Sequence, residues 1–155
     1  MLIPFRFDRD GDLAAQLAQA RADLVVDASG PFQAYGERPY RVAEACIAAG
    51  VPYIALADGS EFVAGIGALD ARAKAAGVFV RSGVSTCPAL TSAVVRRLTD
   101  GWSVVRSVSA GIAPTPWSGM RRSGVPGSAG YAGKPVALVR GGRKARAVAL
   151  GETRR

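Results

Sequence analysis

Three short segments combine glycine with hydroxyl side chains at positions that suit ligand binding: SGPFQAYG (29–36), DGSEFVAG (58–65) and SGVSTC (82–87). The second also has two carboxyl side chains, Asp58 and Glu61. Each segment follows a short apolar run and precedes an amphipathic one, as a loop between a strand and a helix does. If the strands are parallel, all three loops lie at the carboxyl edge of one sheet, where open α/β folds bind ligands. The pattern therefore predicts a binding crevice at that edge.

Side chains that perform acid–base or metal chemistry are scarce. The chain has no histidine, which excludes every mechanism that needs an imidazole from this chain. Its two cysteines, Cys46 and Cys87, lack metal-ligand spacing, so we expect no metal site and a reducing, cytoplasmic setting. Cys87 comes at the start of a predicted helix, but with no base available we expect its thiol to be inert.

Apolar periodicity predicts the elements that hold these loops. The predicted strands are 23–28, 51–57 and 78–82, and the predicted helices are 38–49, 66–76 and 88–99. The nearly continuous apolar run DLVVDA (23–28) is typical of a strand that is buried on both faces of a parallel sheet. Gly50 and Gly77 are predicted to end helices, because glycine takes the left-handed turn at little cost. AAGV occurs at 48–51 and again at 75–78, a step that matches one helix-plus-strand unit.

Each predicted helix has an apolar stripe that should face the sheet. The stripes are Val42, Cys46 and Ala49; Ile66, Leu69, Ala73 and Ala76; and Leu90, Val94 and Leu98. Near the N-terminus we expect a strand at 2–8 and a short helix at 12–20 with Leu13 and Leu17 inward. The expected fold class is therefore α/β, with an incomplete Rossmann-like parallel sheet over residues 1–100.

Residues 101–155 differ in character and predict the start of a second, α+β domain. We expect a strand at 104–112, a loop rich in Gly, Pro and Ser at 113–130, and a hairpin at 135–150 whose Gly-Gly pair suits a type I′ turn. Residues 1–100 have a net charge of −1, and residues 101–155 have a net charge of +9. Such asymmetry indicates either a phosphate- or nucleic-acid-binding region or a segment that faces an acidic surface.

Several linked motifs together resemble the saccharopine dehydrogenase-like family of NAD(P)-dependent oxidoreductases. They are DLVVDASGPFQAYG (23–36), AEACIAAGVPYIALADGSEFVAGI (43–66), GVSTCPALTSAVVRRL (83–98), AGIAP (110–114) and GYAGKPV (130–136). The resemblance covers most of residues 8–150. It implies hydride transfer with NAD(P) on a small-molecule substrate, with the cofactor supplying the chemistry.

The chain departs from this family in two respects. Family members begin with a strand and a GxGxxG turn that places the pyrophosphate on a helix N-terminus, and this sequence has neither. GIGALD (65–70) resembles such a turn only superficially, because the third glycine is absent and no strand leads into it. Relatives are also expected to have Asp where this chain has Ala55. We therefore expect a truncated member that enters at about the third strand, ends before its substrate domain is complete, and is inactive alone, with weak or no NAD(P) binding.

The resemblance places Ser29, Gly30, Pro31 and Phe32 beneath the dinucleotide, where small residues let the backbone approach the ribose and nicotinamide. The alternative is a turn at the strand end in which Gly and Pro serve geometry alone. Gly83 and Val84 could approach the nicotinamide ring, or their loop could simply lead into an N-cap at Ser85 or Thr86.

Asp58, with Gly59 and Glu61, could contact the ligand. A helix cap at Asp58 or Ser60 explains the same residues better.

Two rival functions remain. One is a small basic module that binds RNA or an acidic protein, although the basic segment has few of the aromatic residues that single-strand binders use for stacking. The other is another Rossmann-like enzyme, such as a methyltransferase. No apolar stretch is long enough to span a membrane. An unpaired sheet edge at 23–28 would favour self-association or a homo-oligomer.

Overall fold

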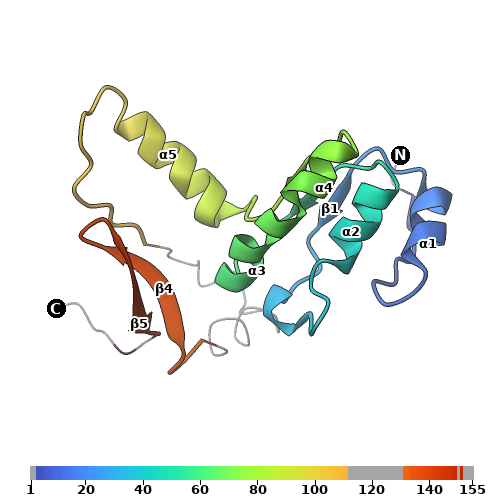
Figure 1. Cartoon of the computed structure of the whole chain (residues 1–155), viewed down its shortest axis with the longest axis horizontal. Coiled ribbons are helices and arrows are strands. Elements are labelled where there is room, and N and C mark those ends of the chain that lie inside the picture. The colour runs from blue at the N-terminus through green and yellow to red at the C-terminus, as the bar shows by residue number, and fades with distance from the viewer. Residues whose placement is uncertain (1–2, 112–130, 150, 152–155) are drawn as a thin grey trace.

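The computed structural model describes residues 3–111, 131–149 and 151 (Figure 1). Its elements are α1 (Leu13–Ala20), β1 (Val25–Asp27), η1 (Phe32–Ala34), α2 (Arg41–Ala48), β2 (Tyr53–Ala55), α3 (Ser60–Gly65), η2 (Ile66–Leu69), α4 (Asp70–Ala75), β3 (Val80–Arg81), η3 (Thr86–Leu90), α5 (Thr91–Leu98), β4 (Pro135–Arg140) and β5 (Arg143–Val148). Strands β1 to β3 alternate with helices, whereas β4 and β5 form a separate hairpin.

The three N-terminal strands form a parallel sheet in the order β1-β2-β3. Val25 lies opposite Tyr53 and Asp27 opposite Ala55, while Tyr53 lies opposite Val80 on the other side. The predicted mixed α/β fold with a parallel sheet is confirmed. The strands are shorter than the sequence indicates, since the hydrogen-bonded ladders span three residues or fewer.

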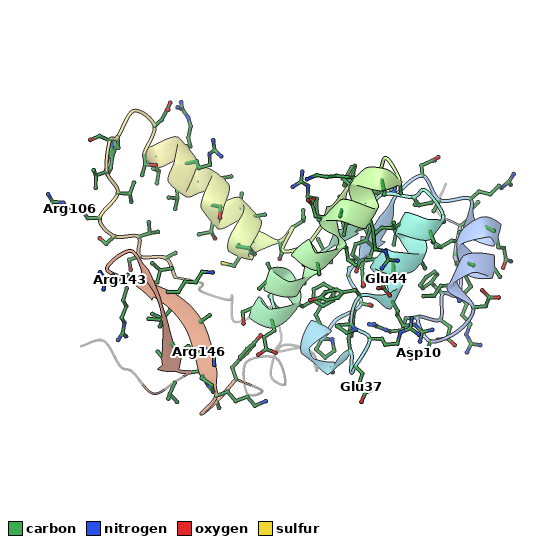
Figure 2. The ribbon with its side chains drawn as sticks, viewed as in Figure 1. Asp10, Glu37, Glu44, Arg106, Arg143 and Arg146 are labelled. Atoms are coloured by element: carbon green, nitrogen blue, oxygen red, sulfur yellow. The ribbon has the colours of Figure 1, made fainter. Side chains whose placement is uncertain are left out.

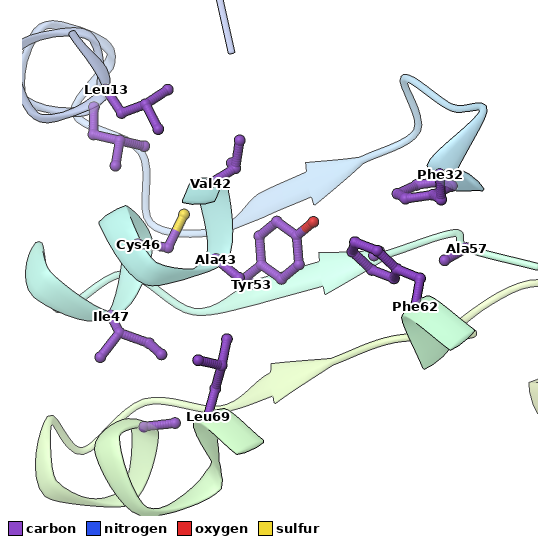
Figure 3. Packing of buried hydrophobic residues seen from close by; sticks show 13 residues of the cluster. Leu13, Phe32, Val42, Ala43, Cys46, Ile47, Tyr53, Ala57, Phe62 and Leu69 are labelled. Carbon is purple, nitrogen blue, oxygen red and sulfur yellow. The ribbon is translucent and has the colours of Figure 1, made fainter. Parts of the chain in front are cut away.

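One face of this sheet carries the core (Figure 3). Tyr53 and Cys46 are almost fully buried, and Leu69 from η2 and Ala73 from α4 belong to the same cluster. The helix ends are as predicted, because Gly50 and Gly77 both have a φ of +69° and an added Cβ would meet nothing at either position. Backbone conformation alone therefore favours glycine at these two turns.

The opposite face of the sheet is open. Val26 is 53% exposed, and Leu24, Leu56 and Phe79 are also exposed. The prediction that residues 23–28 are buried on both faces was wrong. Successive side chains of a strand point to opposite faces, and the helices α2 to α4 cover only one of them.

The N-terminal segment packs through its helix and not through a strand. Asp12 caps α1 by accepting a hydrogen bond from the Ala15 N–H at 3.0 Å, and Leu13 and Leu17 are buried as predicted. The strand predicted at 2–8 is absent from its described part, 3–8. Within the described ranges, β1 is therefore an edge strand of the sheet, as β3 is on the other side.

Helix α5 extends away from the sheet (Figure 1). Its predicted inward stripe is wrong: Leu90, Val94 and Leu98 are 58%, 49% and 70% exposed. Cys87 has an extended backbone, and regular α-helix begins at Thr91 instead of at Pro88. This kink after the third loop turns the helix away from the strands that its stripe would have covered.

The hairpin forms as predicted. Gly141 and Gly142 have φ values of +54° and +74°, which a type I′ turn requires, and Arg140 pairs with Arg143 across it. The strand predicted at 104–112 is absent from residues 104–111, and the loop predicted at 113–130 lies outside the described residues. No helix in the described part of the chain has the length and apolarity to cross a membrane.

Candidate functional site

The three predicted loops follow the carboxyl ends of β1, β2 and β3 and are joined there by backbone hydrogen bonds. The Leu56 N–H donates to the Asp27 carbonyl at 2.9 Å, and the Val84 N–H donates to the Ala55 carbonyl at 3.1 Å. These two bonds extend the sheet by one step beyond its ladders. The loops therefore begin side by side at one edge, as parallel strands dictate.

A buried carboxylate lies at the centre of this edge. Asp27 is 8% exposed and accepts a hydrogen bond from the Tyr53 hydroxyl at 2.8 Å on Oδ2. Its Oδ1 accepts from the Ser29 hydroxyl at 2.6 Å, the Ser29 N–H at 3.1 Å and the Tyr35 hydroxyl at 3.3 Å. Among the described residues, three hydroxyls and one amide satisfy this carboxylate, and no cation is hydrogen-bonded to it.

Ala55 explains how the carboxylate fits. It lies directly opposite Asp27 and is completely buried. An aspartate at position 55, as the resemblance leads us to expect, would bring a second carboxyl beside Asp27 in a site that excludes water. Two carboxylates in one buried site oppose each other's ionisation. The small methyl group avoids this repulsion.

The network holds its neighbours in their neutral forms. Burial, with a smaller effect from the charge of Asp27, raises the pKa of the Cys46 thiol to about 11. Burial likewise raises the pKa of Tyr53 far above its ordinary value, and Asp27 adds to this through its charge and the hydrogen bond. The pKa of Tyr35 is also raised, chiefly by burial. None of these groups can serve as a base near neutral pH.

Arg9 covers the outer side of the network. Its guanidinium carbon lies 3.2 Å from the centre of the Tyr35 ring, a cation–π contact. Its Nη1 and Nη2 are buried and have no hydrogen-bond partner among the described residues. The N-terminal segment is thereby attached to the first loop.

In the first predicted site segment, residues 29–32, the side chains of Ser29 and Phe32 make contacts within the fold, whereas Gly30 leaves its backbone accessible. Ser29 uses its hydroxyl and its N–H on Asp27, and Phe32 is 6% exposed and packs against Phe62 with ring centres 5.0 Å apart. Pro31 is joined to Gly30 by a cis peptide bond and precedes η1. An added Cβ on Gly30 would meet only Phe32, at an ordinary 3.7 Å. Gly30 is therefore the position of this segment at which a ligand can approach the backbone.

The second loop does not form the predicted cap. The residue that caps α3 is Gly59, and no side chain at Asp58 or Ser60 caps the helix. Asp58 is exposed beside the core alanine Ala57. Ser60 donates its N–H to the Tyr131 hydroxyl at 3.0 Å, which joins this loop to the hairpin segment.

The third loop depends on a glycine. Gly83 has a φ of +72°, and an added Cβ would lie 2.8 Å from Cδ of Pro88. Val84 is 37% exposed. The Ser85 side chain makes no capping hydrogen bond to the following helical turn, so the predicted cap at Ser85 is absent. The thiol of Cys87 lies 3.2 Å from the Thr91 hydroxyl, a neutral partner.

A pocket of about 420 Å³ lies beside the first two loops, between them and the hairpin. Its lining includes five aromatic rings, those of Phe32, Tyr35, Tyr40, Phe62 and Tyr131. Its charged lining residues are Glu61, Lys134 and Arg146. Of the predicted site residues, Phe32 lines this pocket, whereas Ser29, Gly30, Pro31, Asp58, Gly83 and Val84 do not.

Sequence reasoning missed the Asp27 network and the pocket. One signal was present for the network: Asp27 interrupts an apolar run, and parallel pairing places Tyr53 on the same face of the sheet. For the pocket there was none, because Tyr131, Lys134 and Arg146 come from a segment whose position relative to the sheet no local pattern encodes.

No group of His, Cys, Asp and Glu side chains among the described residues could hold a metal ion. Comparison with protein-family models and with curated proteins gives no match to this chain.

Proposed function

We propose that the chain belongs to an NAD(P)-linked oxidoreductase of the saccharopine dehydrogenase-like kind and that its carboxyl-edge loops receive the nicotinamide half of the cofactor. The observation that supports this most is the alignment of the three loops by the Leu56–Asp27 and Val84–Ala55 backbone bonds. Ligands of open parallel sheets bind at such an edge.

Two features of the edge fit a ribose or a nicotinamide amide. Gly30 has no side chain, and Phe32 is the one residue within 4 Å of the position of an added Cβ, so a ring or sugar can approach the backbone there. The Ser82 hydroxyl, at the start of the third loop, is buried and has no partner among the described residues. A buried hydroxyl without a partner is costly, and a ligand that supplies one would recover that energy.

The cofactor would supply the hydride chemistry, and the chain would bind and orient it. In this proposal Ser29, Gly30, Pro31 and Phe32 form the floor beneath the ring. Gly83 and Val84 form the side wall, and Asp58 lies at the second loop. The Asp27 network fixes the first loop and takes no part in proton transfer, since its tyrosines stay protonated.

Titration with nicotinamide mononucleotide, followed by NMR, tests the proposal. Adenosine monophosphate is the matched control, because it has the sugar and phosphate without the nicotinamide. We expect saturable binding of the first and at least about tenfold weaker binding of the second, a difference of about 1.4 kcal/mol. Equal affinities would contradict the proposal.

A pair of glycine variants locates the site. Gly30→Ala adds a methyl group that the fold accepts, because its Cβ meets only the Phe32 ring at 3.7 Å, yet it blocks the approach to the backbone. Gly67→Ala is the control, since nothing lies within 4 Å of its Cβ and it belongs to η2, outside the three loops. We expect the first variant alone to weaken the mononucleotide.

A second candidate, a basic module for RNA or an acidic protein, is favoured by one observation. Arg140, Arg143, Lys144 and Arg146 are all exposed on the hairpin. Binding of RNA or of an acidic protein to these side chains would weaken as the salt concentration rises.

A further inference from the structure

The pocket between the aromatic residues and the hairpin has features of a binding site that the nicotinamide proposal does not use. Its volume of about 420 Å³ is within the range of roughly 300–1,000 Å³ that is typical of small-molecule sites. Phe32 is the one residue that the two sites share.

One wall of the pocket is a rigid aromatic surface. Phe62 is the centre of it, with the rings of Phe32, Tyr40 and Tyr35 at 5.0, 4.8 and 5.9 Å. The Tyr40 hydroxyl donates to the Phe62 carbonyl at 3.0 Å, so this ring is also held by a hydrogen bond. Fixed rings favour a flat apolar body, which they can contact without loss of side-chain entropy.

The opposite wall is basic. Lys134 and Arg146 line the pocket from the hairpin, and neither makes an ion pair with a described residue. Arg146 pairs with Ala137, another lining residue, so both belong to the face of the hairpin that borders the pocket. Figure 2 shows Arg146 on the hairpin, with Arg143 nearer the turn.

The two walls are joined by a specific contact. The Ser60 N–H donates to the Tyr131 hydroxyl at 3.0 Å, and Tyr131 itself lines the pocket. With Glu61 as the single acidic lining residue, the three charged residues have a net charge of +1. That balance favours a ligand with one negative charge over a ligand with two.

We propose that this pocket binds a small organic monocarboxylate with a flat apolar body, whose ring lies on the Phe62 cluster and whose carboxylate pairs with Arg146 and Lys134. Arginine suits this role because its planar guanidinium can bind both carboxylate oxygens. The inference does not depend on the nicotinamide proposal, since Phe32 is the one residue that the two sites share and the charged partners are different.

Three probes separate the contributions to binding: 2-naphthoate, the neutral 2-naphthalenemethanol, and acetate. Calorimetry on the full chain should show saturable binding of 2-naphthoate and at least about tenfold weaker binding of the other two. Equal binding of the alcohol would overturn the proposal, because the cations would then contribute nothing. Equal binding of acetate would overturn it as well, because the rings would then contribute nothing.

A matched pair of arginine variants tests the position. Arg146→Gln should weaken 2-naphthoate by about tenfold or more, and Arg143→Gln should leave it unchanged. Both arginines are exposed on β5, and their odd separation puts them on opposite faces of the strand. An equal loss in both variants would show that general positive charge attracts the anion, which would overturn the proposal.

Circular dichroism and the nicotinamide titration separate other causes of failure. Arg146→Gln must keep the spectrum and the mononucleotide affinity of the unaltered chain. Failure of 2-naphthoate to bind while the mononucleotide binds would reject this pocket alone. The reverse result would reject the nicotinamide proposal alone.

Discussion

Replacing Tyr53 with Phe removes one hydroxyl from the buried Asp27 network and leaves the ring in place. Within the described residues, Tyr53 is the one donor to Oδ2 of Asp27, at 2.8 Å. The change therefore leaves a buried carboxylate oxygen without a partner. A hydrogen bond to a charged group contributes about 1.5–3 kcal/mol to the free energy of unfolding. We expect Tyr53→Phe to lower that free energy by an amount near the upper end of this range, because the Asp27 carboxylate stays buried without its partner.

Tyr35→Phe is the internal control. It also removes a hydroxyl from Asp27, but Oδ1 keeps the Ser29 hydroxyl at 2.6 Å and the Ser29 N–H at 3.1 Å. The ring that Arg9 covers is retained. We expect a cost of about 0.5–1 kcal/mol, the range of an ordinary hydrogen bond whose loss leaves the acceptor satisfied.

Urea denaturation, followed by circular dichroism, measures both variants. In an Asp27→Asn background the cost of Tyr53→Phe should fall, because the remaining partner is then neutral, and a double-mutant cycle isolates that difference. A Tyr53→Phe variant within about 0.5 kcal/mol of the unaltered chain, or a Tyr35→Phe variant that costs as much as Tyr53→Phe, would refute the account of the network.

Four further predictions follow from the same structure. Folding raises the pKa of Cys46 from 9.0 to about 11, so the unfolded chain loses the thiol proton at a lower pH than the folded chain does. The contribution of Cys46 to the free energy of unfolding is therefore complete below pH 9 and falls by about 2–3 kcal/mol as pH rises toward 11. Cys46→Ala should flatten that part of the dependence of stability on pH. Calorimetry should find NAD(P) affinity no tighter than millimolar, because the chain lacks the glycine turn that holds a pyrophosphate, and micromolar affinity would contradict this. RNA should bind weakly and without sequence preference, with an affinity that falls steeply with salt; a tight, sequence-selective complex at physiological salt would favour the basic-module candidate. Ultracentrifugation should show that the chain self-associates through the open edge and face at β1. Val26→Lys should reduce this self-association, whereas Val139→Lys, which changes an exposed residue of the hairpin, should not. A monodisperse chain that melts cooperatively above about 60 °C would contradict this prediction.

Local patterns predicted the parts of the fold that depend on nearby residues. The short N-terminal helix with Leu13 and Leu17 inward, the helix ends at Gly50 and Gly77, and the Gly141–Gly142 turn were predicted correctly, because each depends on a few adjacent positions. The inward direction of Leu90, Val94 and Leu98 was not. Their spacing defines an apolar stripe, but the direction of α5 depends on the extended Cys87 before it.

In the candidate site, too, the sequence predicted the features that depend on nearby residues and missed those that depend on distant ones. Parallel strands place their following loops at one edge, so the sequence alone predicted that the loops with Gly30 and Gly83 lie at that edge of the sheet. The buried carboxylate needed the register that brings Tyr53 near Asp27, and the pocket needed the contact between Ser60 and Tyr131, which are far apart in the chain. Contacts of this kind depend on tertiary packing, which residue periodicity does not encode.

The most direct test of the proposed function is an NMR measurement of intermolecular nuclear Overhauser effects from the nicotinamide ring protons of bound nicotinamide mononucleotide. We predict contacts to the α-protons of Gly30 and to the methyl groups of Val84, which is exposed at the third loop. Contacts only to Tyr131 or the hairpin at saturating ligand, or none at all, would contradict the claim that the carboxyl-edge loops receive the nicotinamide.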